Sequence, residues 1–229
     1  TITRAQLEAS GIQTWFDVTR NQLQVTDVSV EQNAITVRFD KTILNAGLNP
    51  STFSIKVNGI NRGITSVAYD TTNQDRCVLT LVGSPPASSA RLTISYIGTA
   101  PNKVTGTSGE DLGIISDRPA DTFISAASVN NLHANYNTLI LSGGSAINGL
   151  GNAKDNTILG NGAINTISGG AGVDSMDGGD STDIYLIGTS TDHSAAEVQD
   201  TGRTGSDELR FSSTTAGQTL TVYAGDTGL

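Results

Sequence analysis

Asparagine and aspartate recur at a fixed spacing in the C-terminal half of the chain. Each opens a triplet whose third residue is large and apolar, and the intervals between triplets are rich in glycine. The first residues lie nine apart and are Asn156, Asn165, Asp174 and Asp183. Oxygen ligands in flexible loops suit Ca²⁺ better than Zn²⁺ or Mg²⁺. The spacing therefore predicts a repeated, oxygen-rich loop able to bind calcium.

Glycine placement defines the repeat most sharply at residues 169–177, GGAGVDSMD, which fits G-G-x-G-x-D-x-U-x with Met176 as the large apolar U. Residues 178–186, GGDSTDIYL, fit except that Ser181 replaces a glycine. Two earlier copies, GNAKDNTIL and GNGAINTIS, are weaker and carry Asn in place of Asp. Four copies in one register indicate an internal repeat.

These copies resemble RTX-type (haemolysin-type) calcium-binding repeats. The resemblance implies a short parallel β-roll in which the apolar U residue points inward and two nine-residue half-turns make one 18-residue coil. It also implies that the carboxylate joins carbonyl oxygens of its own loop and of the loop one coil away. The cofactor implied is Ca²⁺, and the expected metal ligands are Asp174, Asp183, Asp192, Asn156, Asn165, Gly170, Gly172 and Gly179.

Ligand charge sets the expected strength of these sites. One edge of the roll would stack Asn156, Asp174 and Asp192, and the other would stack Asn165 and Asp183. A neutral amide brings no charge, so we expect on the order of one to three ions with affinity around 10⁻⁴–10⁻³ M. An Asn-lined solenoid that holds no metal is the alternative.

The segment after the roll, EVQDTGRTGSDELRF, resembles the less regular part that closes RTX arrays. It keeps fragments of the loop pattern, so Asp207 is either an extra ligand or an exposed acid of a cap. A further strand is expected at residues 219–223.

Short runs of alternating apolar and polar residues occupy the first half of the chain. This period predicts β-strands with one buried face. Six or seven such strands in about 100 residues, with no helical period between them, suggest an Ig-like β-sandwich. Cys77 falls in an inward register and is expected to be a small core residue. The runs are centred on residues 35–39, 53–57, 64–69, 77–81 and 92–96, and an Asn58-Gly59 turn follows the second.

The stretches VEQNAITVRFDKTILNAGLNPSTFSIKVNG and VLTLVGSPPASSARLTISY resemble the SwmB-type Ig-like repeat of large bacterial surface proteins. The resemblance covers residues 23–120 or so and implies a spacer or adhesive module. The chain is thus expected to be all-β, an Ig-like sandwich followed by a β-roll with a cap. The boundaries expected are an N-terminal segment at 1–22, the sandwich at 23–125, the roll at 126–212 and a tail at 213–229.

Charge is divided unevenly between these parts. Residues 1–120 carry 10 basic and 10 acidic residues, whereas residues 121–229 carry 3 basic and 12 acidic residues and 17 of the 26 glycines. We therefore expect the sandwich to stay folded in a chelator while the roll does not. A net charge of −9 argues against nucleic acid as a partner. No apolar run approaches the roughly 20 residues that span a bilayer, and one Cys forms no internal disulfide.

No catalytic constellation is evident. Asp-Thr-Gly triplets at 200–202 and 226–228 lack the preceding apolar strands of aspartic proteases, and His133 and His193 lack zinc-hydrolase spacing. Trp15 is the only Trp, so an aromatic carbohydrate-binding platform has little support. The chain is predicted not to be an enzyme.

The function predicted is a non-catalytic, calcium-binding module of a secreted or cell-surface protein, in adhesion, surface-layer (S-layer) or matrix assembly. The alternative is a calcium-stabilised accessory region of a larger secreted hydrolase or toxin. Expected partners are calcium ions, with other surface-protein copies or cell-surface polysaccharide, and no membrane span. The RTX resemblance implies type I secretion. Since residue 1 is Thr and no signal peptide follows, we expect a fragment, a processed product or a chain exported without an N-terminal signal.

Overall fold

The computed structural model describes residues 22–98, 103–189 and 193–213, together with residues 216, 219 and 221. Trp15, Asp192 and most of the strand expected at 219–223 lie outside them. The described residues form β-strands and one short 3-10 helix, η2 (Pro50–Thr52), with no α-helix. None of their helices is long and apolar enough to cross a membrane. The prediction of an all-β chain is confirmed.

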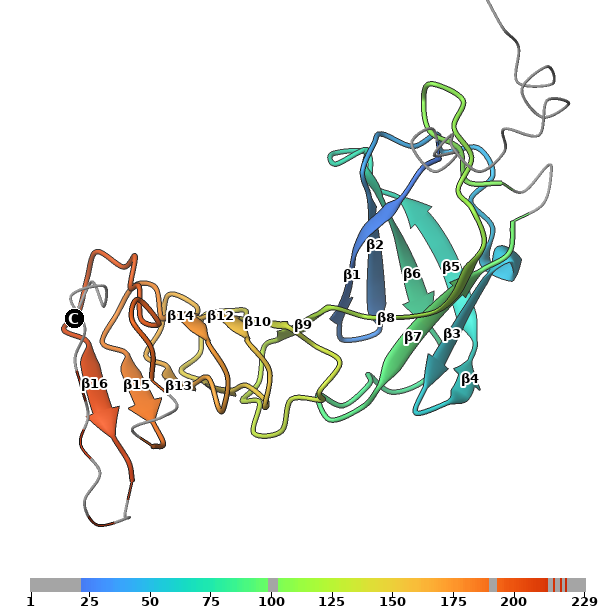
Figure 1. Cartoon of the computed structure of the whole chain (residues 1–229). Coiled ribbons are helices and arrows are strands. Elements are labelled where there is room, and N and C mark those ends of the chain that lie inside the picture. The colour runs from blue at the N-terminus through green and yellow to red at the C-terminus, as the bar shows by residue number, and fades with distance from the viewer. Residues whose placement is uncertain are drawn as a thin grey trace, which may run out of the picture.

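Two antiparallel sheets form the N-terminal half, the sandwich (Figure 1). The alternating runs of the sequence supply their central strands. The first sheet has the order β1 (Val25–Glu31), β2 (Ala34–Phe39), β6 (Arg76–Leu81) and β5 (Ile64–Tyr69). The second has the order β4 (Ile60–Arg62), β3 (Phe53–Val57), β7 (Leu92–Tyr96) and β8 (Ile115–Pro119).

Alternate residues of these strands face a shared core, as the period-two pattern predicts. In β2, Ile35 and Val37 are fully buried, and Ile55 of β3 is buried from the opposite sheet. Cys77 lies in the same core, where burial raises the pKa of its thiol to about 12. The expectation that Cys77 is a small core residue is confirmed.

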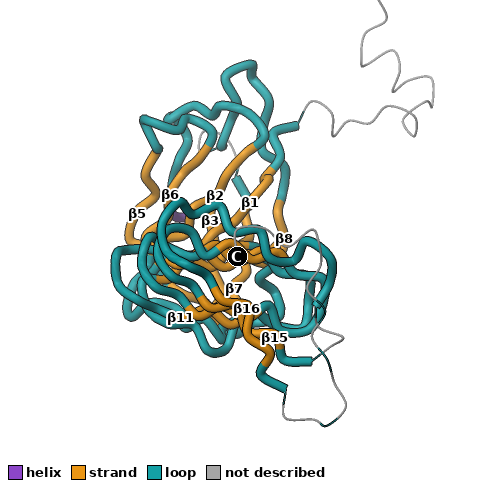
Figure 2. Tube along the Cα trace, turned by 90° about the vertical axis from the view of Figure 1, so that its left-hand side faces the viewer, coloured by secondary structure: helices purple, strands orange, loops and turns teal. Residues whose placement is uncertain are grey.

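Parallel strands form the C-terminal half, the roll, which extends away from the sandwich (Figure 1). Viewed from the end of the roll, its coils overlie one another in front of the sandwich strands (Figure 2). One sheet contains β9 (Thr122–Ser125), β10 (Thr138–Leu141), β12 (Thr157–Leu159) and β14 (Ser175–Asp177). The other contains β11 (Asn148–Leu150), β13 (Thr166–Ser168), β15 (Ile184–Ile187) and β16 (Glu208–Phe211).

Strand register follows the 18-residue coil in the middle of the roll and departs from it at both ends. Thr157 pairs with Ser175, and Thr166 pairs with Ile184. The last step on the second edge is 24 residues long, because Ile184 pairs with Glu208. The U residues Ile158, Ile167, Met176 and Tyr185 are all fully buried, as the repeat pattern predicts.

The two halves share one sheet. Strand β9 pairs in parallel with β1 of the sandwich on one side and with β10 of the roll on the other. The first sandwich sheet and the first roll sheet are therefore a single eight-stranded sheet. The expected boundary at residue 125 falls at the end of β9, the strand that belongs to both halves.

Candidate metal centre

Each Asn or Asp of the repeat lies directly before a strand of the roll, so stacking of the strands stacks these side chains into two ladders. Asn156 and Asp174 precede β12 and β14 on one edge. Asn165, Asp183 and Asp207 precede β13, β15 and β16 on the other. All five are buried except Asp207, which is partly exposed.

Within a ladder, each carboxylate accepts a hydrogen bond from the backbone of the coil before it. The N–H of Asn156 donates to Asp174 Oδ1 at 2.8 Å. On the other edge, the N–H of Asn165 donates to Asp183 Oδ1 at 2.6 Å. The N–H of Asp183 in turn donates to Asp207 Oδ1 at 2.7 Å. The sequence predicted only Asn165 beside Asp183, and the structure adds Asp207, 24 residues further on.

The asparagines make hydrogen bonds within the protein through both ends of their amides. Asn165 Oδ1 accepts from the N–H of Asn161 at 2.9 Å, while its Nδ2 donates to the Ile147 carbonyl at 2.7 Å. Asn156 Oδ1 accepts from the N–H of Asn152 at 2.7 Å. These contacts match the metal-free alternative for the earlier coils. The role of Asn156 and Asn165 as calcium ligands stays a prediction.

The three predicted glycine ligands lie in loops where adjacent coils approach each other closely. Gly170 and Gly172 have φ of +99° and +123°, and Gly179 has φ of +87°. A Cβ on Gly170 would lie 2.3 Å from the carbonyl oxygen of Asn152, so no larger residue fits. Tight stacking explains these glycines physically, and their part in metal binding stays a prediction.

Among the described residues, the repeat on the first edge ends after Asp174. The strand register places Val198 beside Met176, a step of 22 residues rather than 18. The side chain of Glu197 turns inward there, where its Oε2 lies 2.8 Å from His193 Nδ1 and both residues are buried. Asp192 lies outside the described residues, so its predicted place above Asp174 is untested.

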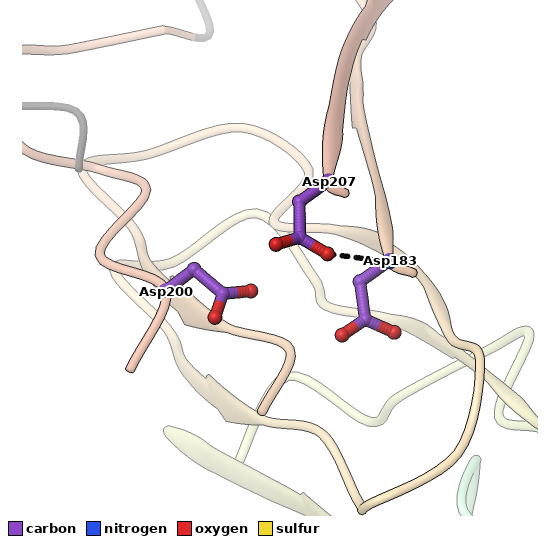
Figure 3. A group of neighbouring side chains, drawn as sticks. All are labelled: Asp183, Asp200 and Asp207. Atoms are coloured by element: carbon purple, nitrogen blue, oxygen red, sulfur yellow. Dashed lines mark hydrogen bonds between the residues drawn. The ribbon is translucent and has the colours of Figure 1, made fainter. Parts of the chain in front are cut away.

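Three carboxylates meet at the end of the second edge (Figure 3). Asp183 and Asp207 come from the ladder, and Asp200 comes from the segment that crosses between the two edges. One oxygen from each lies within 4.8 Å of the others. We call Asp183, Asp200 and Asp207 the acidic cluster. In the sequence, Asp200 is marked only by its Asp-Thr-Gly triplet, because the irregular 24-residue step hides its register.

Tyr185 positions Asp200. The N–H of Gly178 donates to the Tyr185 hydroxyl at 2.6 Å, and the hydroxyl donates to Asp200 Oδ2. The other oxygen of Asp200 accepts from the N–H of Gly202 at 2.7 Å. The buried U residue of the last full repeat therefore fixes the third carboxylate as well as filling the core.

The carboxylate of Asp183 is buried and only partly satisfied by hydrogen bonds. The residue is fully buried, and its Oδ2 has no hydrogen-bond donor among the described residues. Burial, opposed by the hydrogen bond from Asn165 and reinforced by repulsion from Asp207, Asp200 and Asp177, raises the pKa of Asp183 to about 6. A cation would supply the missing partner for Oδ2 and neutralise the converging charge. The residues present therefore fit a hard cation.

No protein-family model and no curated protein matches the chain. Among solved structures, the chain is similar to the S-layer protein rSbsC(31-844), with 21% identity and a TM-score of 0.37 over 44% of this chain and 13% of that one. The N-terminal part of the bacterial S-layer protein SbsC gives 20% identity and 0.36, over 48% of this chain and 24% of that one. Surface layer protein SbsC, domains 1-6, gives 20% and 0.37, over 52% and 15%. Values this low support no functional inference, and the RTX and SwmB-type resemblances stay predictions.

Proposed function

We propose that this chain is a non-catalytic, calcium-binding module of a secreted or cell-surface protein. The observation that carries the proposal is the acidic cluster, in which Asp183 lies beside two further carboxylates and its buried Oδ2 has no hydrogen-bond donor among the described residues. Such an arrangement is costly without a cation, because like charges at short distance repel most strongly where water is excluded.

The donor set favours calcium. Asp183, Asp200 and Asp207 offer only oxygen, and they come from loops of a stacked roll rather than from a rigid octahedral cage. Cys77 is buried in the sandwich, away from the roll, so thiolate ligation has no support. Bound calcium would offset the repulsion among the carboxylates and link the last coil to the coil before it.

A surface role is part of the same proposal. A site with few carboxylate ligands binds calcium weakly, with a dissociation constant around 10⁻⁴–10⁻³ M, as is typical of extracellular modules. Such a site is occupied only where calcium is abundant. Together with the RTX resemblance, this favours a module exported by type I secretion that acts outside the cell in adhesion, surface-layer or matrix assembly. Other copies of the surface protein or a polysaccharide are the proposed partners.

Calorimetric titration with CaCl₂ tests the proposal. We expect about one ion per chain, with a dissociation constant around 10⁻⁴–10⁻³ M. Asp207→Asn removes one cluster charge but leaves an oxygen to accept from the Asp183 N–H, so it should weaken binding at least about tenfold while the fold is retained. Glu208→Gln is the matched control, because Glu208 is the adjacent exposed acid, paired with Arg210 at 2.7 Å. No calcium uptake at millimolar concentration, or equal loss in both variants, would contradict the proposal.

A further inference from the structure

Two asparagines in the middle of the roll clamp neighbouring coils together with their side-chain amides. Asn152 Nδ2 donates to the carbonyl oxygens of Tyr136 at 2.9 Å and His133 at 3.1 Å. Its Oδ1 accepts from the N–H of Lys154 at 2.9 Å. A primary amide has two N–H donors, and here both reach carbonyls of the coil before. We call Asn152 and Asn161 the amide clamps.

Asn161 repeats the arrangement on the opposite edge. Its Nδ2 donates to the carbonyl oxygens of Ser145 at 3.0 Å and Ser142 at 3.4 Å, and its Oδ1 accepts from the N–H of Ala163 at 3.0 Å. The residue is buried. Each clamp draws together carbonyl oxygens that would otherwise need another positive partner, so these coils are closed without an ion.

One coil later both clamps are absent. The positions 18 residues after Asn152 and Asn161 are Gly170 and Gly179, which have no side chain to donate. Close stacking also excludes one, since a Cβ on Gly170 would lie 2.3 Å from the Asn152 carbonyl oxygen. The ladder changes at the same place from Asn to Asp. Negative charge therefore enters the two ladders only in the coils that lack an amide clamp.

The first coil of the roll is held by the sandwich rather than by an ion. The N–H of Asp121 donates to the Val28 carbonyl at 2.9 Å, and β9 continues the ladder along β1. From a second direction, the N–H of His133 donates to the Ser88 carbonyl of the sandwich at 2.9 Å. Solenoids need a cap at each end, and the sandwich is the cap at this end.

We propose that the roll is divided into two parts by its need for a cation. Coils from β9 to β13 fold on the sandwich edge and are closed by the amide clamps without metal. Only the part beyond the clamps, with β14, β15, the acidic cluster and β16, becomes ordered when a cation binds. The second half of this proposal rests on the proposed function, and it narrows the sequence-based expectation that the whole roll unfolds in a chelator.

Amide hydrogen exchange of the full chain, measured in CaCl₂ and in EGTA, tests the division. In EGTA we expect exchange at β14, β15 and β16 to accelerate at least tenfold, while β10, β12 and β13 keep their protection. Calorimetric titration of the same sample distinguishes a failure of the proposed function from a failure of the division. Absence of calcium uptake would overturn the proposed function. Calcium uptake with protection lost throughout the roll in EGTA, or lost nowhere, would overturn the division alone.

Asn161→Ala tests the clamps without any ion. The variant should expose β10 and β13 to faster exchange in EGTA, because the Ser142 and Ser145 carbonyls lose the side-chain donor that ties their coil to the next one. Asn131→Ala, at an exposed asparagine of the first coil, is the matched control and should change neither strand. Equal protection of β13 in Asn161→Ala and in the unmodified protein would overturn the clamp role even if the proposed function holds.

Discussion

At the scale of residues, the ladder side chains meet the polar backbone groups of neighbouring coils in two chemically different ways. Where the ladder carries Asn165, the amide both accepts from a backbone N–H and donates to a backbone carbonyl. A carboxylate such as Asp183 accepts in the same way but has no hydrogen to donate. Each replacement of Asn by Asp therefore removes an internal bond and adds a charge, which a bound cation or, at low pH, a proton can offset. A nine-residue spacing alone does not distinguish these cases.

The raised pKa of Asp183 gives a pH dependence of stability in EGTA. Its folded pKa of about 6 exceeds the ordinary value of 3.8, so between these values the folded state binds more protons than the unfolded state. The contribution of Asp183 is then fully present below about pH 4 and is lost as pH rises through 6. We expect Asp183→Asn to raise the melting temperature in EGTA at pH 7.5 by a few degrees, with little effect at pH 4.5. An equal shift at both pH values would contradict the assignment.

Tyr185→Phe separates the positioning of Asp200 from core packing. The ring stays, but the Gly178 N–H loses its buried acceptor, which costs about 1–3 kcal/mol. Asp200 also loses the hydroxyl that orients it, so calcium affinity should fall about three- to tenfold at the same stoichiometry. Denaturant unfolding in saturating CaCl₂ and calorimetric titration measure the two effects. Unchanged affinity in a destabilised variant would show that the hydroxyl serves the fold alone.

At the scale of elements, local periodicity predicts the strands but not the pairing between strands that are far apart in the sequence. Ile35, Ile55 and Ile158 could be placed in the core because alternation and the U position depend only on near neighbours. The pairing of β1 with β9 leaves no such signal, since parallel strands about 90 residues apart share no local pattern. The 24-residue step to Asp207 is equally hidden, because an insertion shifts the register without changing composition. Asp183 was therefore predictable as a site residue, whereas Asp200 was not.

At the scale of the whole molecule, the continuous sheet argues against two independent domains. Buried residues of sandwich and roll form one apolar cluster that includes Phe123 of β9 and Tyr136 of the first coil, whose ring centroids are 5.3 Å apart. Because the first strand of the roll takes its hydrogen bonds from β1, the roll should not stay folded once the sandwich has unfolded. With calcium bound, we expect β6 and β12 to unfold together.

Destabilising the sandwich far from the roll tests this coupling. Phe53 of β3 packs on Tyr96 with ring centroids 5.0 Å apart, in the sheet that does not continue into the roll. Phe53→Ala should cost about 3–5 kcal/mol. If the molecule is one cooperative unit, its urea midpoint falls equally for β6 and β12, as followed by hydrogen exchange in CaCl₂. Phe123→Ala, at the join, is the comparison and should also lower both midpoints. A roll that keeps its own midpoint in Phe53→Ala would show that β1 supports the first coil without being required for it.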